Sequence, residues 1–150
     1  MNILADLETF LRSLALRIDG FDELGDTSLA TDEFGETIDV SEDPFIPEIL
    51  TSAAFFNPFD GDKDFFCLDG PDGQCHSICC NFLLKNDSLD HGYRLFTGFA
   101  LHKMSDEWFT HSFIINNDCA IVEPTSTQHR LYVGIELSGE KLKNFIKNHA

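Results

Sequence analysis

The spacing of apolar residues changes along this chain from a helical period to a strand period. Apolar side chains in residues 3–18 recur at i, i+3, i+4 and i+7, which predicts an amphipathic helix that ends at Gly20. The same spacing returns over residues 75–83 and predicts a second helix, with Cys75 in its first turn. Dense turn residues over 69–73 favour a helix start at this point.

After residue 92, polar and apolar side chains alternate with the period of two that is typical of strands. The alternation predicts four strands, over residues 93–101, 108–116, 119–123 and 131–137. A closing helix is expected after Ser138, a residue type that often caps helix N-termini. Together these elements predict an α+β protein in which N-terminal helices pack on an antiparallel sheet of about four strands.

The chain of 150 residues fits a single domain, 1–150. We divide it into the N-terminal helix (1–18), an acidic irregular region (19–64) and a core (65–150). Within the irregular region we expect one short strand at Thr37–Val40 and a short helix from Pro47 to Leu50. Phenylalanines between residues 55 and 66 are expected to pack across the sheet or beside a cleft.

The net charge of −16 is concentrated in one segment. Between Asp19 and Asp64 there are 14 acidic residues and one basic residue, a net charge of −13. This balance argues against nucleic-acid binding, because few cations are present to neutralise phosphates. The segment is either a solvated acidic loop or a surface that attracts a basic protein partner or mimics a nucleic acid.

Three further features bear on location. No apolar run reaches the length of about 18 residues that a membrane helix needs, so we expect no membrane partner. Acids near the N-terminus argue against a secretory signal, and five cysteines, an odd number, argue against a disulfide framework. We therefore expect a cytoplasmic protein with free thiols.

Cys75 is the candidate nucleophile. A thiolate attacks carbonyl carbons, and the positive end of a helix and a neighbouring imidazolium both lower the pKa of a thiol. A cysteine in the first turn of a helix also offers its backbone N–H to an oxyanion. Gln74 is a candidate for a second oxyanion donor, and Trp108 is a candidate wall of the cleft, with core packing as its alternative.

His111 and Glu123 lie on consecutive expected strands. If residues 116–118 form a three-residue hairpin loop, the register pairs Glu123 directly with His111, whereas a two-residue loop would pair His111 with Pro124. Directly paired side chains share a face, with Cβ atoms roughly 4.5–5.5 Å apart. Glu123 is then able to orient the ring of His111 and to stabilise its charged form.

Gly-Gln-Cys before a helix, His-Ser-Phe-Ile on a strand and Ile-Val-Glu-Pro-Thr on the next strand resemble the core of papain-like and transglutaminase-like cysteine enzymes. The resemblance covers roughly residues 70 to 137. It implies a papain/transglutaminase-like core with Cys75 as nucleophile, His111 as base and Glu123 as the orienting acid. The chain departs from that pattern with a glutamate in place of aspartate, with His76 after the cysteine, and with Phe113 where tryptophan is usual.

The sequence thus points to a cysteine enzyme that acts on an amide or ester carbonyl of a protein or small substrate through a thioester, as hydrolase, deamidase or transferase, without a cofactor. The alternative is a non-catalytic interaction or inhibitor protein that binds a basic partner through residues 19–64. No metal site is assigned, although Cys75, His76, Cys79 and Cys80 form a conceivable ligand cluster. Cys79 and Cys80 are expected to pack in the core, and His76 to face solvent or the cleft rim.

Overall fold

The computed structural model describes residues 9–11, 28–29, 45–56, 65–71, 74–86, 92–102, 107–125 and 129–150. Residues 9–11 are helical, and the rest of the helix expected over residues 3–18 lies outside the described residues. The strand expected at Thr37–Val40 also lies outside them.

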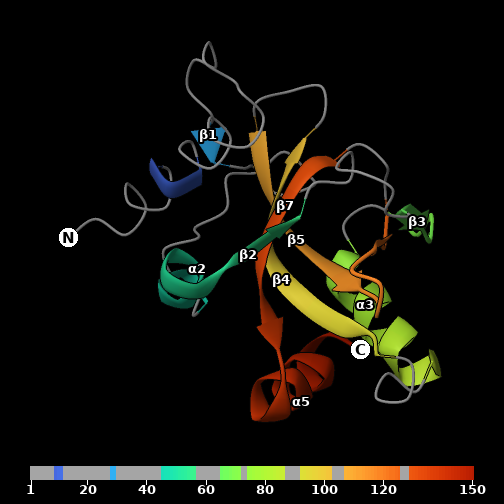
Figure 1. The fold of residues 1–150 in the computed structure, drawn as a ribbon. Helices are drawn as coiled ribbons and strands as arrows, with labels where there is room; N and C mark the ends of the chain where they lie inside the picture. Colours follow the sequence, from blue (N-terminus) through green and yellow to red (C-terminus); the bar gives the residue numbers. More distant parts are fainter. Residues whose placement is uncertain are drawn as a thin grey trace.

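A curled sheet forms the centre of the protein (Figure 1). Its strands are β1 (Ser28–Leu29), β2 (Ala54–Phe56), β3 (Phe65–Cys67), β4 (Arg94–His102), β5 (Glu107–Ile115), β6 (Ile121–Glu123) and β7 (His129–Leu137). Six of them follow the order β2-β7-β4-β5-β6-β3, and β1 pairs with β5. The four strands predicted from the alternation are confirmed as β4 to β7.

The prediction of about four antiparallel strands was wrong in two respects. The sheet also contains β1, β2 and β3, and the pairings of β1 with β5 and of β3 with β6 are parallel. These extra strands are two or three residues long, too short for an alternation to be recognised.

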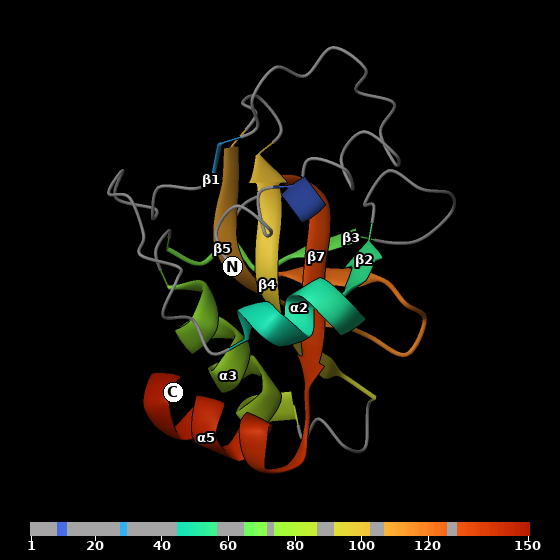
Figure 2. The same cartoon turned by 90° about the vertical axis from the view of Figure 1, so that its left-hand side faces the viewer.

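Besides residues 9–11, the described part of the chain contains the helices α2 (Ile46–Ser52), α3 (Cys75–Asn86) and α5 (Gly139–His149). Figure 2 shows α2 lying across the sheet, with α3 and α5 beside each other near one end of it. Ser138 occupies the N-cap position of α5 as expected, but its side chain makes no capping hydrogen bond. Among the described helices, none has the length and apolar character needed to cross a membrane.

The main hydrophobic core lies between these helices and one face of the sheet. Side chains from all three helices meet alternate residues of the long strands there: Ile49, Cys79, Cys80, Leu83, Leu95, Phe99, Trp108, Ile114, Leu131, Val133 and Phe145. Because side chains alternate along a strand, the residues between them point to the opposite face.

A second, smaller cluster covers that opposite face of the sheet. It contains Phe96, Ala100, Phe113, Ile115, Ile121 and Tyr132, with Phe56 packed against it. Phe56 meets the rings of Phe96 and Phe113 edge-on, as expected of the aromatic stretch. Phe55 and Phe66 differ from the expectation, since each is 48% exposed.

The β5–β6 hairpin sets the position of Glu123, and its register differs from the prediction. Val122 pairs with Ile114, so Glu123 follows opposite Phe113 rather than opposite His111. The three-residue loop comprises residues 117–119, one position later than expected, because the backbone N–H of Cys119 bonds the carbonyl of Asn116 and Cys119 adopts a φ of 62°. That is a type I turn followed by a left-handed residue, a common three-residue connection.

Candidate active site

A buried histidine–glutamate contact lies on the sheet face opposite the helices. Nε2 of His111 is 2.9 Å from both carboxylate oxygens of Glu123, and both side chains are fully buried. Glu123 is offset by two residues from His111 along the paired strands, so it remains on the same face. The two predicted residues are therefore in contact, although the direct pairing that was expected is not present.

Further polar groups surround the carboxylate of Glu123. Tyr132 donates its hydroxyl proton to Oε2 at 2.6 Å, and the backbone N–H and hydroxyl of Thr125 donate to Oε1 at 3.1 and 3.2 Å. Nε2 of His129 lies 3.9 Å from Oε1. A buried charge needs such partners because they replace the hydration that it loses.

Small residues on β4 give Tyr132 access to the carboxylate. Tyr132 pairs with Ala100 on β4, and Gly98 pairs with His111 on β5. Ala100 and Gly98 carry little or no side chain on this face, so the β7 tyrosine passes over β4 to Glu123.

Cys75 approaches His111 where β5 and β6 separate. Pairing in the observed register stops at Val122–Ile114. The next position on β6 that would donate a hydrogen bond to β5 is Pro124, which has no N–H. The first turn of α3 lies against β5 at this point, with Cys75 interacting with His111 and His76 bonding to Ser112. The helix begins here because the carbonyl of Gln74 accepts a bond from the N–H of Ile78.

The charges of Cys75, His111 and Glu123 stabilise one another. Burial opposes ionisation of the Cys75 thiol, but the imidazoles of His111 and His76 lower its pKa to about 5. Burial also opposes protonation of His111, yet the charges of Glu123 and Cys75 raise its pKa to about 10. Against the effect of its burial, Glu123 has its pKa lowered to about 2, chiefly by His111. The group therefore favours a thiolate, an imidazolium and a carboxylate at neutral pH.

The two nitrogens of His111 have different surroundings. Nε2 faces the carboxylate, whereas Nδ1 is buried and has no hydrogen-bond partner among the described residues. Nδ1 is thus the ring atom left to exchange a proton with the thiol of Cys75.

The other cysteines lack this environment. Burial raises the pKa of Cys79 well above its ordinary value, and burial raises the pKa of Cys80 to about 11. Both thiols pack in the main core, as expected. Cys67 also has a raised pKa, first because of burial, and Cys119 is exposed at the hairpin turn.

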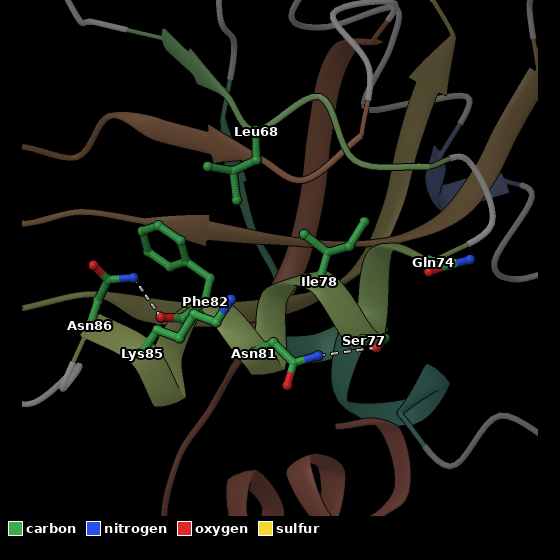
Figure 3. Close-up of a pocket in the computed structure, with 8 residues that line it drawn as sticks. All are labelled: Leu68, Gln74, Ser77, Ile78, Asn81, Phe82, Lys85 and Asn86. Carbon is green, nitrogen blue, oxygen red and sulfur yellow. Dashed lines mark hydrogen bonds between the residues drawn. The ribbon is translucent and has the colours of Figure 1, made fainter.

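Trp108 and Gln74, the other two candidate site residues, lie elsewhere in the structure. Trp108 is buried in the main core, on the face of β5 opposite to that of His111. Gln74 is exposed and lines a hollow of about 300 Å³ that runs along α3 (Figure 3). The hollow is lined by Leu68, Gln74, Ser77, Ile78, Asn81, Phe82, Lys85 and Asn86. Ile78 and Phe82, which were expected in the buried stripe of α3, instead lie half-buried beside this hollow.

His76, which was expected to face solvent or the cleft rim, lies beside Cys75. Its Nδ1 is hydrogen-bonded to the hydroxyl of Ser112, which donates to Thr97 at 3.0 Å.

A metal ion has one conceivable ligand set among the described residues. Ligand atoms of His111, Glu123 and His129 lie within 4.8 Å of one another, and two imidazoles with a carboxylate is a combination that zinc accepts. Both carboxylate oxygens, however, already receive hydrogen bonds from Tyr132 or Thr125 and contact His111. We therefore assign the three residues to a hydrogen-bonded cluster.

Sequence reasoning missed Tyr132, Thr125, His129 and Ser112 as parts of this region. Thr125 follows Glu123 by two residues, and a hydroxyl residue so close to a buried acid is a recognisable local signal. Tyr132 and Ser112 occupy ordinary strand positions, and only the curvature of the sheet and the start of α3 bring them to the site.

Comparisons of the chain with protein-family models, with curated proteins and with solved structures returned no match.

Proposed function

We propose that this protein is a cysteine-nucleophile enzyme that transfers the acyl group of an amide or ester through a thioester at Cys75. The observation that carries this proposal is the buried pair of His111 and Glu123, joined at 2.9 Å, beside a thiol whose pKa is lowered to about 5. A thiolate at neutral pH is the form of cysteine that attacks carbonyl carbon.

The chemistry follows from the positions of the three side chains. Sγ of Cys75 bonds to the carbonyl carbon, and the resulting oxyanion lies near the N-terminus of α3, whose free N–H groups favour negative charge. When the intermediate collapses, the bond to the leaving nitrogen or oxygen breaks and His111 donates its proton to the leaving group. Glu123 holds the ring in place and stabilises its charged form.

The second half-reaction releases the acyl group. A water or amine attacks the thioester and gives a proton to His111, and the C–S bond then breaks with its electron pair returning to sulfur. Water yields a hydrolase or deamidase, whereas an amine yields a transferase. The hollow along α3 includes Gln74, the residue before Cys75 in the sequence, and it offers space and amide groups for part of a substrate.

The arrangement also supports a papain/transglutaminase-like core. Its support is the combination of a cysteine at the start of a helix, a histidine on a strand and an acid on the next strand, packed around an antiparallel pair.

The test is the pH dependence of iodoacetamide labelling, followed by mass spectrometry at each cysteine. We expect Cys75 to label with an apparent pKa well below the ordinary thiol value of about 8.5, and His111→Ala to abolish this behaviour. Buried Cys80, with its pKa raised to about 11, and exposed Cys119 are internal references in the same sample.

Labelling of Cys75 with an ordinary thiol pKa, unchanged in His111→Ala, would contradict the proposal. That outcome would favour the alternative of a non-catalytic protein that binds a basic partner through residues 19–64. An acyl adduct on Cys75 after treatment with an activated ester, absent in Cys75→Ser, would identify the thioester directly.

A further inference from the structure

His76 makes contacts that the three-residue site does not use. Its Nδ1 is bonded to the hydroxyl of Ser112 on β5 and lies 3.9 Å from Sγ of Cys75. Its ring packs edge-on against Phe145 of α5 at 5.2 Å and beside His149 at 4.9 Å. Contacts from the sheet and from α5 therefore fix this ring next to the sulfur.

The hydroxyl contacts indicate which nitrogen of His76 carries a proton. Ser112 donates its own hydroxyl proton to Oγ1 of Thr97, so its oxygen acts as an acceptor towards His76. Nδ1 of His76 must then be the donor, and the N–H on this nitrogen lies close to the sulfur of Cys75 as well. Thr97 and Ser112 are buried polar residues, and this chain of bonds satisfies both of them.

We propose that His76 is a second imidazole that stabilises the Cys75 thiolate through its Nδ1–H, independently of the His111–Glu123 pair. This inference rests on the proposed function, since it assigns a role to a thiolate nucleophile. His111 loses its proton to the leaving group during the reaction, whereas the proton on His76 is not transferred. When water attacks the thioester, its proton goes to His111, the C–S bond breaks towards sulfur, and the N–H of His76 meets the returning negative charge.

The charged and titratable groups around His76 are few among the described residues. Cys75 is on the same helix, His149 faces the ring from α5, and His111 reaches the same sulfur from β5. Because burial and the nearby His76 lower the pKa of His149, His149 does not supply a competing positive charge at neutral pH.

Two substitutions separate the N–H from the packing of the ring. His76→Phe keeps an aromatic ring against Phe145 but removes the donor, whereas His76→Asn places an amide N–H near the former Nδ1 position. We expect His76→Phe to raise the apparent pKa for labelling of Cys75 by about one unit and to slow labelling at pH 5 about fivefold, with little change at neutral pH, where the thiol is ionised in both proteins. His76→Asn should restore most of the rate, and both variants should unfold cooperatively like the unmodified chain.

The outcomes distinguish this inference from the function on which it rests. Labelling of His76→Phe at the unmodified rate, with His111→Ala still impaired, would overturn the role of His76 and leave the Cys–His nucleophile intact. Equal loss in His76→Phe and His76→Asn would also overturn it, because the effect would then come from packing. An ordinary thiol pKa for Cys75 in the unmodified chain would instead reject the proposed function itself.

Discussion

Glu123 is a buried acid that has to reach His111 along a diagonal of the sheet. Its directly opposite residue is Phe113, two positions away from His111. Diagonal neighbours on paired strands are roughly 7–8 Å apart, a distance that a long side chain can bridge. This geometry gives a physical reason for a glutamate, rather than the shorter aspartate, at this position.

Shortening this side chain provides a test at the residue scale. We expect Glu123→Asp to lose the contacts at 2.9 Å with His111, to raise the apparent pKa for Cys75 labelling by about one to two units, and to slow labelling at pH 5 about fivefold to fiftyfold. Urea unfolding should reveal a stability loss of about 1–3 kcal/mol, because buried donors such as Tyr132 lose their acceptor.

Glu123→Gln is the matched comparison, since it keeps the length and removes the charge. It should preserve the hydrogen-bonded position of His111 better than Glu123→Asp does, but its neutral amide should not stabilise the charged form of His111. Unchanged labelling in Glu123→Asp would mean that the diagonal reach is not what positions the acid.

At the scale of elements, the β5–β6 hairpin illustrates how far sequence reasoning extends. The loop has three residues, the longer of the two lengths considered, but the side chain of Asn116 accepts bonds from the N–H groups of Asp118 and Ala120, and the turn lies one residue later. The resulting offset of two residues leaves Glu123 on the expected face. A shift that moved the pairing by one residue would have turned it away from His111.

The order and spacing of Cys75, His111 and Glu123 were therefore enough to identify a set of interacting residues. The partners of Glu123 could not be predicted in this way. Tyr132 reaches the carboxylate across β4, and that contact depends on the curvature of the sheet and on the small residues Gly98 and Ala100. The alternation of polar and apolar residues carries no information about such curvature.

The close backbone approach between the paired strands β4 and β7 provides a second test. Gly98 lies opposite Gly134, and a Cβ at Gly98 would come within 2.2 Å of the carbonyl oxygen of Val133. The contact is with backbone, which cannot move aside without shifting a central strand. We expect Gly98→Ala to lower the free energy of unfolding by about 2–4 kcal/mol, measured by urea denaturation, and to reduce Cys75 labelling because His111 is paired with Gly98.

Gly139→Ala is the control for this experiment. Gly139 has a φ of 57°, but a Cβ there meets nothing within 4 Å, so only backbone strain of about 1 kcal/mol is expected. Equal losses in the two variants would contradict a role for the close approach of β4 and β7.

At the scale of the whole molecule, the chain combines an acidic segment with a buried cluster of ionisable groups. The excess negative charge lies in residues 19–64, whereas the cluster around Glu123 pairs its own charges internally. The acidic segment and the buried cluster predict different responses to salt and to pH. Binding of a basic partner through the acidic segment should weaken with salt, while the buried cluster is little screened and should respond to pH.

Among the groups of this cluster, His129 has the effect on the pH dependence of stability that is easiest to isolate. Burial and the nearby charge of His111 lower its pKa to about 3, against about 6.5 in an unfolded chain. Below pH 6.5 the unfolded state therefore binds a proton that the folded state does not, and stability is lost as the pH falls. The slope that one such group contributes is about 1.4 kcal/mol per pH unit.

We therefore expect the free energy of unfolding to fall more steeply between pH 6 and pH 5 in the unmodified chain than in His129→Asn, by about 1.4 kcal/mol per unit. Cys75 acts in the same direction, because its lowered pKa also makes the folded state bind fewer protons, but it is present in both proteins. His111 adds little in this window, since most of it is protonated in both states below the unfolded pKa of about 6.5, and its contribution is lost as the pH rises from about 6.5 towards 10. Equal slopes in His129→Asn and the unmodified chain would mean that His129 is protonated in the folded protein, and the charge balance around Glu123 would have to include a second imidazolium.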